Sequence, residues 1–279
     1  MQSYLAPPEI AEIAIENSIK KVNQSARNLI LLGILAGASI AFASEGSNMA
    51  AFNLFARPET YGLGKCLAGA IFGTGLMIVV IAGGELFTGN TLIIAGILEK
   101  KIKLSSMLRN WFYVYLGNLI GSIFIAWMMN VSGLFASGAN DLGAMTIKIA
   151  LYKVSLTFLQ AFVLGIMCNW LVCLAIWMSY GAKDITGKIL AVFFPIWLFI
   201  TSGFEHSIAN MYYIPAGIIA KGNPQYVQAA LNMGVHLDKL DYLNWGTFFT
   251  KNLIPVTCGN IVGGGIFVAG IYWFVYSKK

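Results

Sequence analysis

Long apolar runs alternate with short polar segments along the whole chain of 279 residues. A membrane-spanning helix needs about 20 mostly apolar residues. Runs that reach this length cover approximately residues 28–46, 64–98, 110–131, 154–180, 189–220 and 253–276. The pattern predicts an all-α polytopic membrane protein with six transmembrane helices.

The second and fifth apolar runs are too long for one straight helix, and each has polar residues near its middle. These polar stretches are residues 85–90 and 205–210. Unwound backbone at membrane depth is tolerated only where it is buried in protein or faces a water-filled cavity. We therefore expect transmembrane helices 2 and 5 to be interrupted, with the interruptions beside a pore.

The two halves of the chain repeat each other. The third and sixth runs share a basic residue and Asn, then Gly-Asn, then Gly: Arg109-Asn110, Gly117-Asn118 and Gly121 match Lys251-Asn252, Gly259-Asn260 and Gly263. A weaker echo links Leu32-Gly33-Ile34 to Leu164-Gly165-Ile166. Three spans per half make the second copy cross the membrane in the opposite sense, and inverted repeats place the substrate path near the midplane. The repeats are expected at 28–131 and 154–276.

The glycines of these repeats have a simpler explanation, which is close helix packing through small residues four apart. The residues before the first span predict an amphipathic helix on the membrane surface, within 1–27, because Ile10, Ile13 and Val22 share one face. This polar opening does not resemble a secretory signal. Residues 221–252, the longest segment outside the membrane, are predicted to form a short structured cap.

Composition agrees with a membrane protein, since 58% of the residues are hydrophobic and only 11% are charged. A soluble domain has about twice that charged fraction. The segments on the side of the two termini hold eleven Lys and Arg residues, and those on the other side hold seven. Since cytoplasmic segments carry an excess of Lys and Arg, this favours cytoplasmic termini. The net charge of +6 suits contact with anionic lipid and does not require nucleic acid. The four cysteines lack metal-ligand spacing, so we expect buried packing residues, no metal and no cofactor.

Two histidines occur in the chain. His236 falls in the polar 221–252 segment and is expected at the surface. His206 falls inside a span, where ionisable residues are usually functional, and histidine is the natural proton donor near neutral pH. A satisfied structural histidine is the alternative.

Other polar residues inside the spans allow two interpretations each. Glu85 with Asn90, and Glu205 with Asn210, are expected to be structural acceptors at the broken helices, because a bare carboxylate would repel an anion. Lys153 is expected at the start of the fourth span, either snorkelling to the interface or attracting anions. Asn169 and Asn260 either bond between helices or line the path.

The broken segments carry the resemblance to a known family. Gly203-Phe204-Glu205-His206-Ser207-Ile208-Ala209-Asn210-Met211, Glu85-Leu86-Phe87-Thr88-Gly89-Asn90 and Asn252-Leu253-Ile254-Pro255-Val256-Thr257 with Gly259-Asn260 resemble the formate/nitrite transporters. The resemblance covers residues 8–277. It implies an aquaporin-like protomer in a homopentamer, with passage of small monovalent anions or their neutral acids through each protomer.

The resemblance also implies roles for single residues. Leu86, Phe87 and Thr88 would form the loop that breaks the second helix, and Leu76 with Leu86 would narrow the cytoplasmic side. Phe72 and Phe199 would narrow the opposite side. His206 would stand between these constrictions, and its polar neighbours would be Thr88, Asn169 and Asn260. Lys153 would match the family's vestibule lysine.

Formate is the preferred substrate because the long 221–252 segment is similar to the formate branch, whereas the Glu85 form of the motif leaves nitrite and hydrosulfide open. The anion either gains a proton near His206 and crosses as a neutral acid, or stays charged and accepts a hydrogen bond.

An enzyme is disfavoured, since two distant histidines form no metalloprotease motif and no G-x-S-x-G occurs. A scaffold protein is disfavoured by the buried polar residues. A neutral-solute pore is the alternative outside anion transport. The expected location is the bacterial cytoplasmic membrane.

Overall fold

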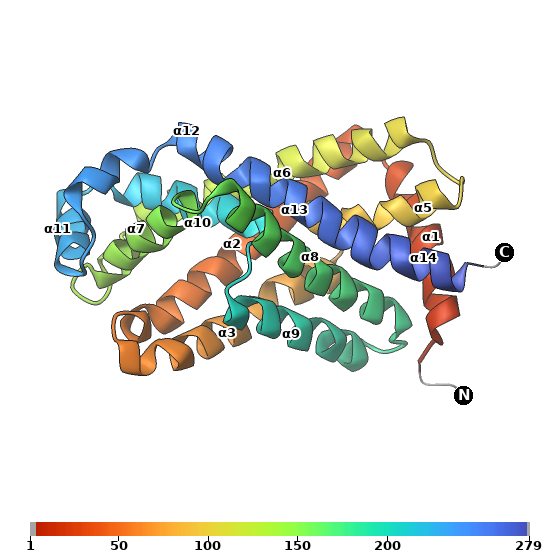
Figure 1. Cartoon of the computed structure of the whole chain (residues 1–279), viewed down its shortest axis with the longest axis horizontal. Coiled ribbons are helices and arrows are strands. Elements are labelled where there is room, and N and C mark those ends of the chain that lie inside the picture. The colour runs from red at the N-terminus through yellow and green to blue at the C-terminus, as the bar shows by residue number, and fades with distance from the viewer. Residues whose placement is uncertain (1–3, 278–279) are drawn as a thin grey trace.

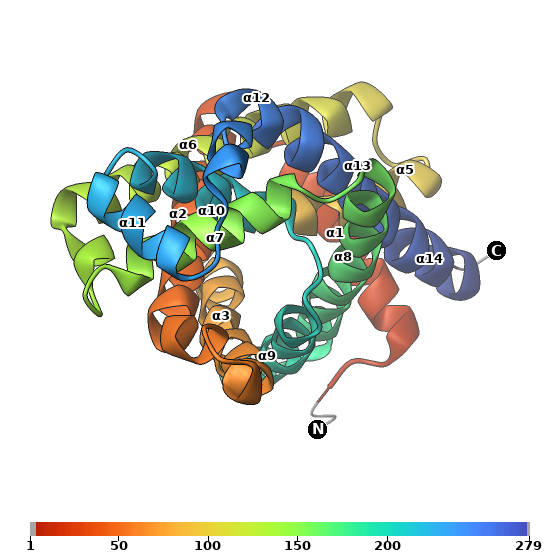
Figure 2. The ribbon, with the colours of Figure 1, turned by 60° about the vertical axis from the view of Figure 1, so that its left-hand side comes forward.

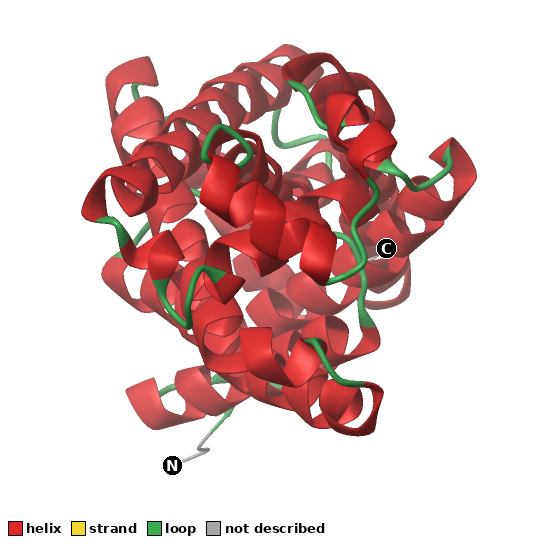
Figure 3. Cartoon of the chain, turned by 90° about the vertical axis from the view of Figure 1, so that its left-hand side faces the viewer, coloured by secondary structure: helices red, strands yellow, loops and turns green. Residues whose placement is uncertain are grey.

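The computed structural model describes residues 4–277, and this part of the chain is built from helices joined by short loops (Figure 3). It contains no β-strand, only an isolated bridge between Tyr4 and Ala182. Six helical stretches are long and apolar enough to cross a membrane: Ala26–Phe55, Pro58–Ala82, Leu104–Ser132, Phe158–Gly181, Ile185–Ser202 and Trp245–Tyr276. The predicted fold class and number of spans are confirmed.

The first half of the chain contains α1 to α6. Its α-helices are α1 (Pro7–Val22), α2 (Ala26–Phe55), α3 (Tyr61–Ala82), α4 (Phe87–Asn90), α5 (Ile94–Leu98) and α6 (Leu104–Ser132). Short 3-10 turns at Pro58–Thr60 and Thr91–Ile93 precede α3 and join α4 to α5. Residues Phe87–Leu98 therefore form one short apolar helical segment after the break in the second span.

The second half contains α7 to α14. Its α-helices are α7 (Asp141–Val154), α8 (Phe158–Gly181), α9 (Ile185–Ser202), α10 (Ser207–Ala220), α11 (Pro224–Asn232), α12 (Trp245–Thr247), α13 (Ile254–Gly264) and α14 (Ile271–Tyr276). Two π-helical turns, Phe248–Leu253 and Gly265–Gly270, join α12, α13 and α14 into the last span. Short 3-10 turns lie at Leu134–Ala136 and Leu237–Tyr242. The 221–252 segment is thus structured, as predicted.

The fourth span begins later than predicted. Residues up to Val154 belong to α7, and α8 starts at Phe158. Thr157 caps α8, because its hydroxyl accepts from the Gln160 amide while the Gln160 side chain accepts from the Thr157 amide. A reciprocal capping box of this kind fixes a helix start. Lys153 therefore lies in the last turn of α7 and does not begin the fourth span.

The helix α7 is the counterpart of α1; the sequence pattern predicted α1 within 1–27 but did not predict α7. Ser25 caps α2 after α1 in the same way that Thr157 caps α8 after α7. In both halves the following span packs against the last one, α2 against α6 and α8 against α13 (Figure 1). The repeat thus extends to α1 and α7, beyond the limits 28–131 and 154–276.

Glycines allow the paired helices to approach closely. A Cβ at Gly117 of α6 would lie 2.6 Å from the carbonyl oxygen of Ile30 on α2, and Gly121 faces the carbonyl of Ile34 in the same way. On α13, Gly259 and Gly263 face the backbone of α8. The predicted packing role of these glycines is confirmed. The broken spans α3 and α9 pack against each other between these two helix pairs (Figure 2).

The described chain begins and ends on the same side of the molecule, where α1 packs against α14 (Figure 1). His236 is exposed, as predicted. The cysteines are not all buried, because Cys258 is exposed on α13 and Cys66 is half-buried. The error arises because an apolar run does not distinguish the protein-facing side of a helix from its lipid-facing side.

Candidate functional site

The break in the fifth span is held by one asparagine. The helix α9 ends at Gly203, whose φ of +81° lies in the left-handed region that favours glycine. Asn260 of α13 then braces the loop: its amide nitrogen donates to the carbonyls of Gly165 (2.8 Å) and Glu205 (3.0 Å), and its oxygen accepts from the Ser207 amide (2.9 Å). The bonds to the Glu205 carbonyl and from the Ser207 amide satisfy backbone groups that the interrupted helix leaves without partners, and the bond to Gly165 ties the loop to α8.

The break in the second span has the same construction. The helix α3 ends at Gly83, with φ of +93°, and Asn118 of α6 takes the place of Asn260. Its amide nitrogen donates to the carbonyls of Gly33 (2.8 Å) and Glu85 (2.9 Å), and its oxygen accepts from the Phe87 amide (2.9 Å). The loop therefore covers residues 83–86, whereas Phe87 and Thr88, expected in the loop, open α4.

Each break also carries a glutamate in a network of ion pairs and amides. Glu205 accepts from Lys153 (2.8 Å) and Asn210 (2.6 Å), and Asn210 donates to Asn252 (2.7 Å). Asn252 in turn donates to the Lys153 carbonyl (2.9 Å). All these partners belong to the framework around the break, which supports the structural role expected for Glu205 and Asn210.

The first half reproduces this network. Glu85 accepts from Lys21 (2.8 Å), Gln24 (2.9 Å) and Asn90 (2.7 Å). Asn90 donates to Asn110 (2.8 Å), and Asn110 donates to the Lys21 carbonyl (3.0 Å). The lysine at the end of α1 thus corresponds to Lys153 at the end of α7.

His206 connects the two breaks. It is the N-cap of α10, where its Nδ1 accepts from the Ala209 amide (3.0 Å), and its Nε2 lies 3.0 Å from the Thr88 hydroxyl in α4. The ring is 3% exposed and lies against Phe199, with centroids 6.0 Å apart. Since Nδ1 accepts a hydrogen bond, the proton of the neutral ring is on Nε2, which donates to Thr88.

Apolar side chains surround this pair. Phe72 of α3 and Phe199 of α9 meet edge to face, with ring centroids 5.7 Å apart, and both are buried. Leu76 lies one helical turn beyond Phe72, and Leu86 is the N-cap of α4; both are buried. The structure therefore brings together the predicted aromatic residues and His206, with the two leucines in the same core.

Three of the predicted pore residues have mainly structural contacts. Phe87 packs on α6, with its ring centroid 5.6 Å from that of Trp111 and 4.8 Å from that of Tyr115. Asn260 is used in the loop brace described above. Asn169 donates to the carbonyls of Thr88 (3.1 Å) and Asn260 (2.7 Å), so it fixes the backbone beside His206.

A cavity of about 500 Å³, called the vestibule below, leads to the break between α9 and α10. Its polar lining includes Asn48, Lys65, Lys148, Lys153, Ser202 and Glu205. Lys153 therefore lines this cavity, and its role as the family's vestibule lysine stays a prediction. Its ammonium is paired with Glu205 and lies 5.1 Å from the centroid of the Tyr213 ring.

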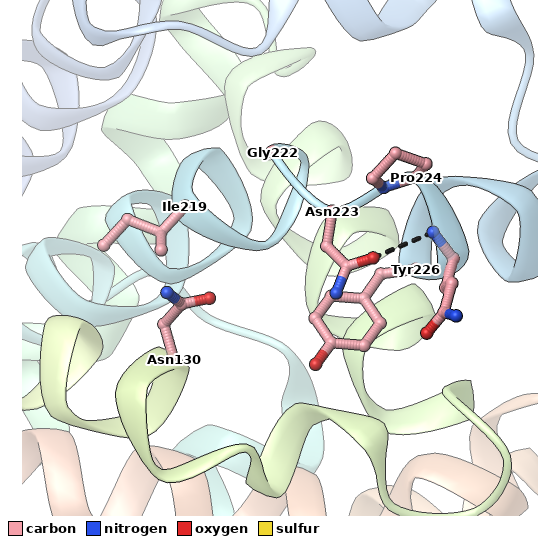
Figure 4. A pocket seen from close by; sticks show the side chains of 7 residues that line it. Asn130, Ile219, Gly222, Asn223, Pro224 and Tyr226 are labelled. Atoms are coloured by element: carbon pink, nitrogen blue, oxygen red, sulfur yellow. Dashed lines mark hydrogen bonds between the residues drawn. The ribbon is translucent and has the colours of Figure 1, made fainter.

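A second hollow, of about 880 Å³, lies where α6 and α10 end and α11 begins (Figure 4). It is lined by Asn130 and by residues around the α10–α11 connection. Asn223 caps α11 there by accepting from the Gln225 amide (2.9 Å). This hollow does not include His206, Thr88 or Lys153, so it is separate from the candidate site.

The sequence analysis assigned no structural role to five residues that form buried hydrogen bonds. Asn110, Asn118 and Asn252 are positions of the repeat, and the repeat also gives Lys21, because Lys21 precedes Gly33 by the same interval as Lys153 precedes Gly165. Glu45, buried in α2, accepts from the Tyr212 hydroxyl, and no repeat in the sequence indicates this contact. Among residues 4–277 no cluster of three or more His, Cys, Asp or Glu is arranged to hold a metal ion.

Known proteins share both the sequence and the fold. The chain is 39% identical to a probable formate transporter of Methanothermobacter thermautotrophicus, over 99% of each chain. It is also 39% identical to the formate channel FocA of Haemophilus influenzae, over 98% of this chain and 95% of that protein. A solved pentameric formate channel with formate bound superposes with a TM-score of 0.79 and 40% identity, over 91% of this chain and 98% of that one.

A solved ion channel of the same family superposes with a TM-score of 0.78 and 29% identity, over 96% of this chain and 98% of that one. The family model described as formate/nitrite transporter matches residues 8–274. The expected resemblance is thus confirmed over nearly the whole length. This multi-pass membrane protein belongs to the formate/nitrite transporter family.

Proposed function

We propose that the protein conducts small monovalent anions, with formate as the first substrate, through a path that passes the His206–Thr88 pair. The observation that carries this proposal is one buried hydrogen-bonding pair, contributed by both broken helices, beside a pair of apolar rings. Burying an ionisable side chain at this depth costs free energy, so the ionisable residues found there usually serve a function. Nitrite and hydrosulfide are the alternatives in the same class.

The helix ends favour an anion at this point. The segment Phe87–Leu98 and the helix α10 both begin at the breaks, and His206 and Thr88 join their N-termini. A helix N-terminus carries roughly +0.5 elementary charge. Two N-termini that converge therefore offset part of the cost of bringing a negative charge into the protein.

The hydrogen-bond direction favours a neutral His206 as a donor. The Nδ1 atom already accepts from Ala209, so a second proton there would face the amide hydrogen and break the cap of α10. Neutral His206 donates from Nε2 to the Thr88 oxygen. The Thr88 hydroxyl hydrogen then remains to bind an anion, or the anion takes the Nε2–H bond directly.

Both transport mechanisms follow from this arrangement. In the first, the anion accepts a proton near His206 and passes the apolar rings as a neutral acid, because a charge in a dry constriction is costly. In the second, the anion remains charged and only accepts hydrogen bonds. The Nδ1 bond to Ala209 disfavours a doubly protonated ring. It therefore supports the second mechanism, or a form of the first in which the proton comes from water.

The same relationship suggests the assembly and location. The solved relative with formate bound is described as pentameric, and we infer a homopentamer for this chain with a pore in each protomer. The exposed apolar side chains of the spans would contact lipid and neighbouring protomers. We further infer a bacterial cytoplasmic membrane with both termini inside, no resident cofactor and no enzymatic reaction.

Flux into proteoliposomes tests the proposal. Formate, nitrite, hydrosulfide and a neutral solute would be compared across pH for the native protein, His206→Asn and the matched control His236→Asn, whose histidine is exposed. We expect formate flux well above that of empty liposomes, reduced in His206→Asn and unchanged in His236→Asn.

Each outcome decides between mechanisms. If the pH dependence of flux survives in His206→Asn, the proton-transfer mechanism at His206 is wrong. If folded protein passes the neutral solute but none of the anions, the anion-channel proposal is wrong and a neutral-solute pore replaces it. A rate for nitrite or hydrosulfide far above that for formate would reassign the substrate within the class.

A further inference from the structure

Three lysines line the vestibule, and their ammonium groups have different partners. Lys153 is ion-paired with Glu205 at 2.8 Å. Lys148 donates to the carbonyl of Met233 at 2.9 Å. Lys65 has no carboxylate within ion-pair distance among the described residues 4–277. No neighbouring carboxylate neutralises Lys148 or Lys65, and of these two lysines Lys65 is the one beside the break, 3.6 Å from the Cβ position of Gly203.

Aromatic rings hold Lys65 in place. Its ammonium lies 6.0 Å from the ring centroid of Phe55 and 5.8 Å from that of Tyr61, within the range of cation–π attraction. Such rings orient an ammonium without a counter-charge, so the net positive charge stays available to a ligand. Lys153, by contrast, forms with Glu205 a pair whose net charge is zero.

The ammonium of Lys65 lies at the entrance to the broken span. It is 3.6 Å from the position that a Cβ on Gly203 would occupy, and Gly203 opens the loop that ends at His206. The Thr201 hydroxyl lies against Gly69, one helical turn along α3 from Lys65, and Thr201 and Ser202 line the same cavity. A positive charge and two hydroxyl-bearing residues thus converge just before the Phe72–Phe199 rings.

The other half of the molecule has no such arrangement. Gly83, the counterpart of Gly203, has open space within 4 Å of its Cβ position. The Lys–Glu pairs occur in both halves and belong to the framework, whereas Lys65 occurs beside one break only. A residue that departs from the repeat is not needed to build the broken helix, so its position calls for another explanation.

We propose that Lys65, with Thr201, Ser202 and Gly203, forms a capture site that binds a small monovalent anion before it enters the constriction. This proposal rests on the proposed anion transport and assigns the attraction of the anion to Lys65, in place of the neutralised Lys153. An unpaired charge in a cleft with low-dielectric walls raises the local concentration of the opposite ion. The capture site therefore sets the flux at low anion concentration, and the constriction sets the maximal rate.

Concentration-dependent flux in proteoliposomes tests the capture site with Lys65→Met, Lys65→Arg and the control Lys239→Met. Lys239 is an exposed lysine of the Leu237–Tyr242 turn and does not line the vestibule. In Lys65→Met we expect formate flux at low concentration to fall about 10-fold, since focused charge typically changes such rates by 10-fold or more. The maximal rate is retained, Lys65→Arg restores the flux, and Lys239→Met matches the native protein.

Ionic strength supplies an independent readout. At about 1 M of an impermeant salt the Debye length falls to about 3 Å, so native protein and Lys65→Met should converge. Equal flux of the two proteins at low concentration and low salt would overturn the capture site. So would a loss in Lys65→Met of the same factor at every formate concentration, because that pattern indicates a damaged pore.

Direct binding separates this proposal from the transport proposal. Line broadening of ¹³C-formate by detergent-solubilised protein reports binding without requiring flux. We expect broadening by native protein that is lost in Lys65→Met and kept in Lys239→Met. Absence of flux in native protein would contradict the transport proposal alone, whereas equal broadening by native protein and Lys65→Met would contradict the capture site alone.

Discussion

The two broken spans share a framework and differ in a few side chains. In both, a left-handed glycine ends the first half-helix, and an asparagine from the last span of that repeat holds the loop. In both, a glutamate also pairs with a lysine from the short helix that precedes the first span of the repeat. At the N-cap of the second half-helix, however, Leu86 stands in one copy and His206 in the other. The repeated residues build the break, and the unrepeated ones supply its chemistry.

The difference between the copies also explains how one site arises from two halves. His206 comes from the second break and Thr88 from the first, and their contact requires both breaks at the same depth. The unpaired Lys65 likewise stands beside one break. Polar residues that obey the repeat are therefore candidates for structure, and those that depart from it are candidates for transport.

Removing the glutamates should have the largest effect, and the two copies should differ in size. In Glu205→Ala the ammonium of Lys153, whose side chain is 12% exposed, would remain buried without its partner. Breaking a buried ion pair in this way costs about 3–5 kcal/mol. Lys21 is 24% exposed, so water would compensate part of the loss in Glu85→Ala. In detergent, the melting temperature of Glu205→Ala should be lower than that of Glu85→Ala, and both should be lower than that of the native protein.

Exposed carboxylates provide the control for this comparison. Asp238→Ala removes a charge from the exposed Leu237–Tyr242 turn and should leave the melting temperature unchanged. If Glu205→Ala unfolded at the native temperature while formate flux disappeared, Glu205 would act in transport and the structural interpretation of the repeated residues would be wrong.

Much of this division could be predicted from the sequence. The broken spans followed from apolar runs too long for one helix with polar residues at their centres, and His206 followed from its place inside a span. The Gly-Asn repeat placed Asn118 and Asn260 in equivalent positions. Their hydrogen bonds to the loops could not be predicted, because a repeat gives equivalence and not the direction of a side chain.

Other features lay beyond the pattern for physical reasons. The helix α7 is short and mostly apolar, so a count of apolar residues does not distinguish it from the span that follows, and Lys153 was placed on the wrong helix. Phe87 looks like a pore residue in the motif, yet its ring fits against Trp111 and Tyr115 on α6. The free charge of Lys65 depends on what does not lie nearby, which only the three-dimensional packing reveals.

Cutting the contact between the two halves should have an intermediate effect. Thr88→Val keeps the volume of the side chain but removes the hydroxyl that accepts from His206. Losing one hydrogen bond to a charged ligand costs about 1.5–3 kcal/mol, which corresponds to a formate flux about 10-fold or more lower. Flux into proteoliposomes measures this, and the melting temperature should also fall, by less than in Glu205→Ala, because the buried Nε2–H of His206 loses its acceptor.

Thr146→Val is the matched control for Thr88→Val. Thr146 is also buried, but its hydroxyl donates to the Leu142 carbonyl inside α7 (2.8 Å) and does not contact His206. Its flux should match that of the native protein. Equal losses in both variants would mean that any buried hydroxyl matters and that Thr88 has no particular place in the path.

Alanine at the two turn glycines should have the smallest effect and the sharpest contrast. Both residues have positive φ, so Gly83→Ala and Gly203→Ala each add about 1 kcal/mol of backbone strain and should lower the melting temperature alike. The new methyl group meets open space at Gly83, but at Gly203 it meets the ammonium of Lys65 at 3.6 Å. The distance of 3.6 Å is an ordinary van der Waals contact, so the ammonium keeps its place and the methyl group fills space beside it that a bound anion would use. Only Gly203→Ala should therefore lower formate flux at low concentration, by a factor of about two to three, because the anion would bind farther from the ammonium. Equal flux in the two variants would show that the mouth of the second break has no more influence on the anion than the first, and the asymmetry would then reside in His206 alone.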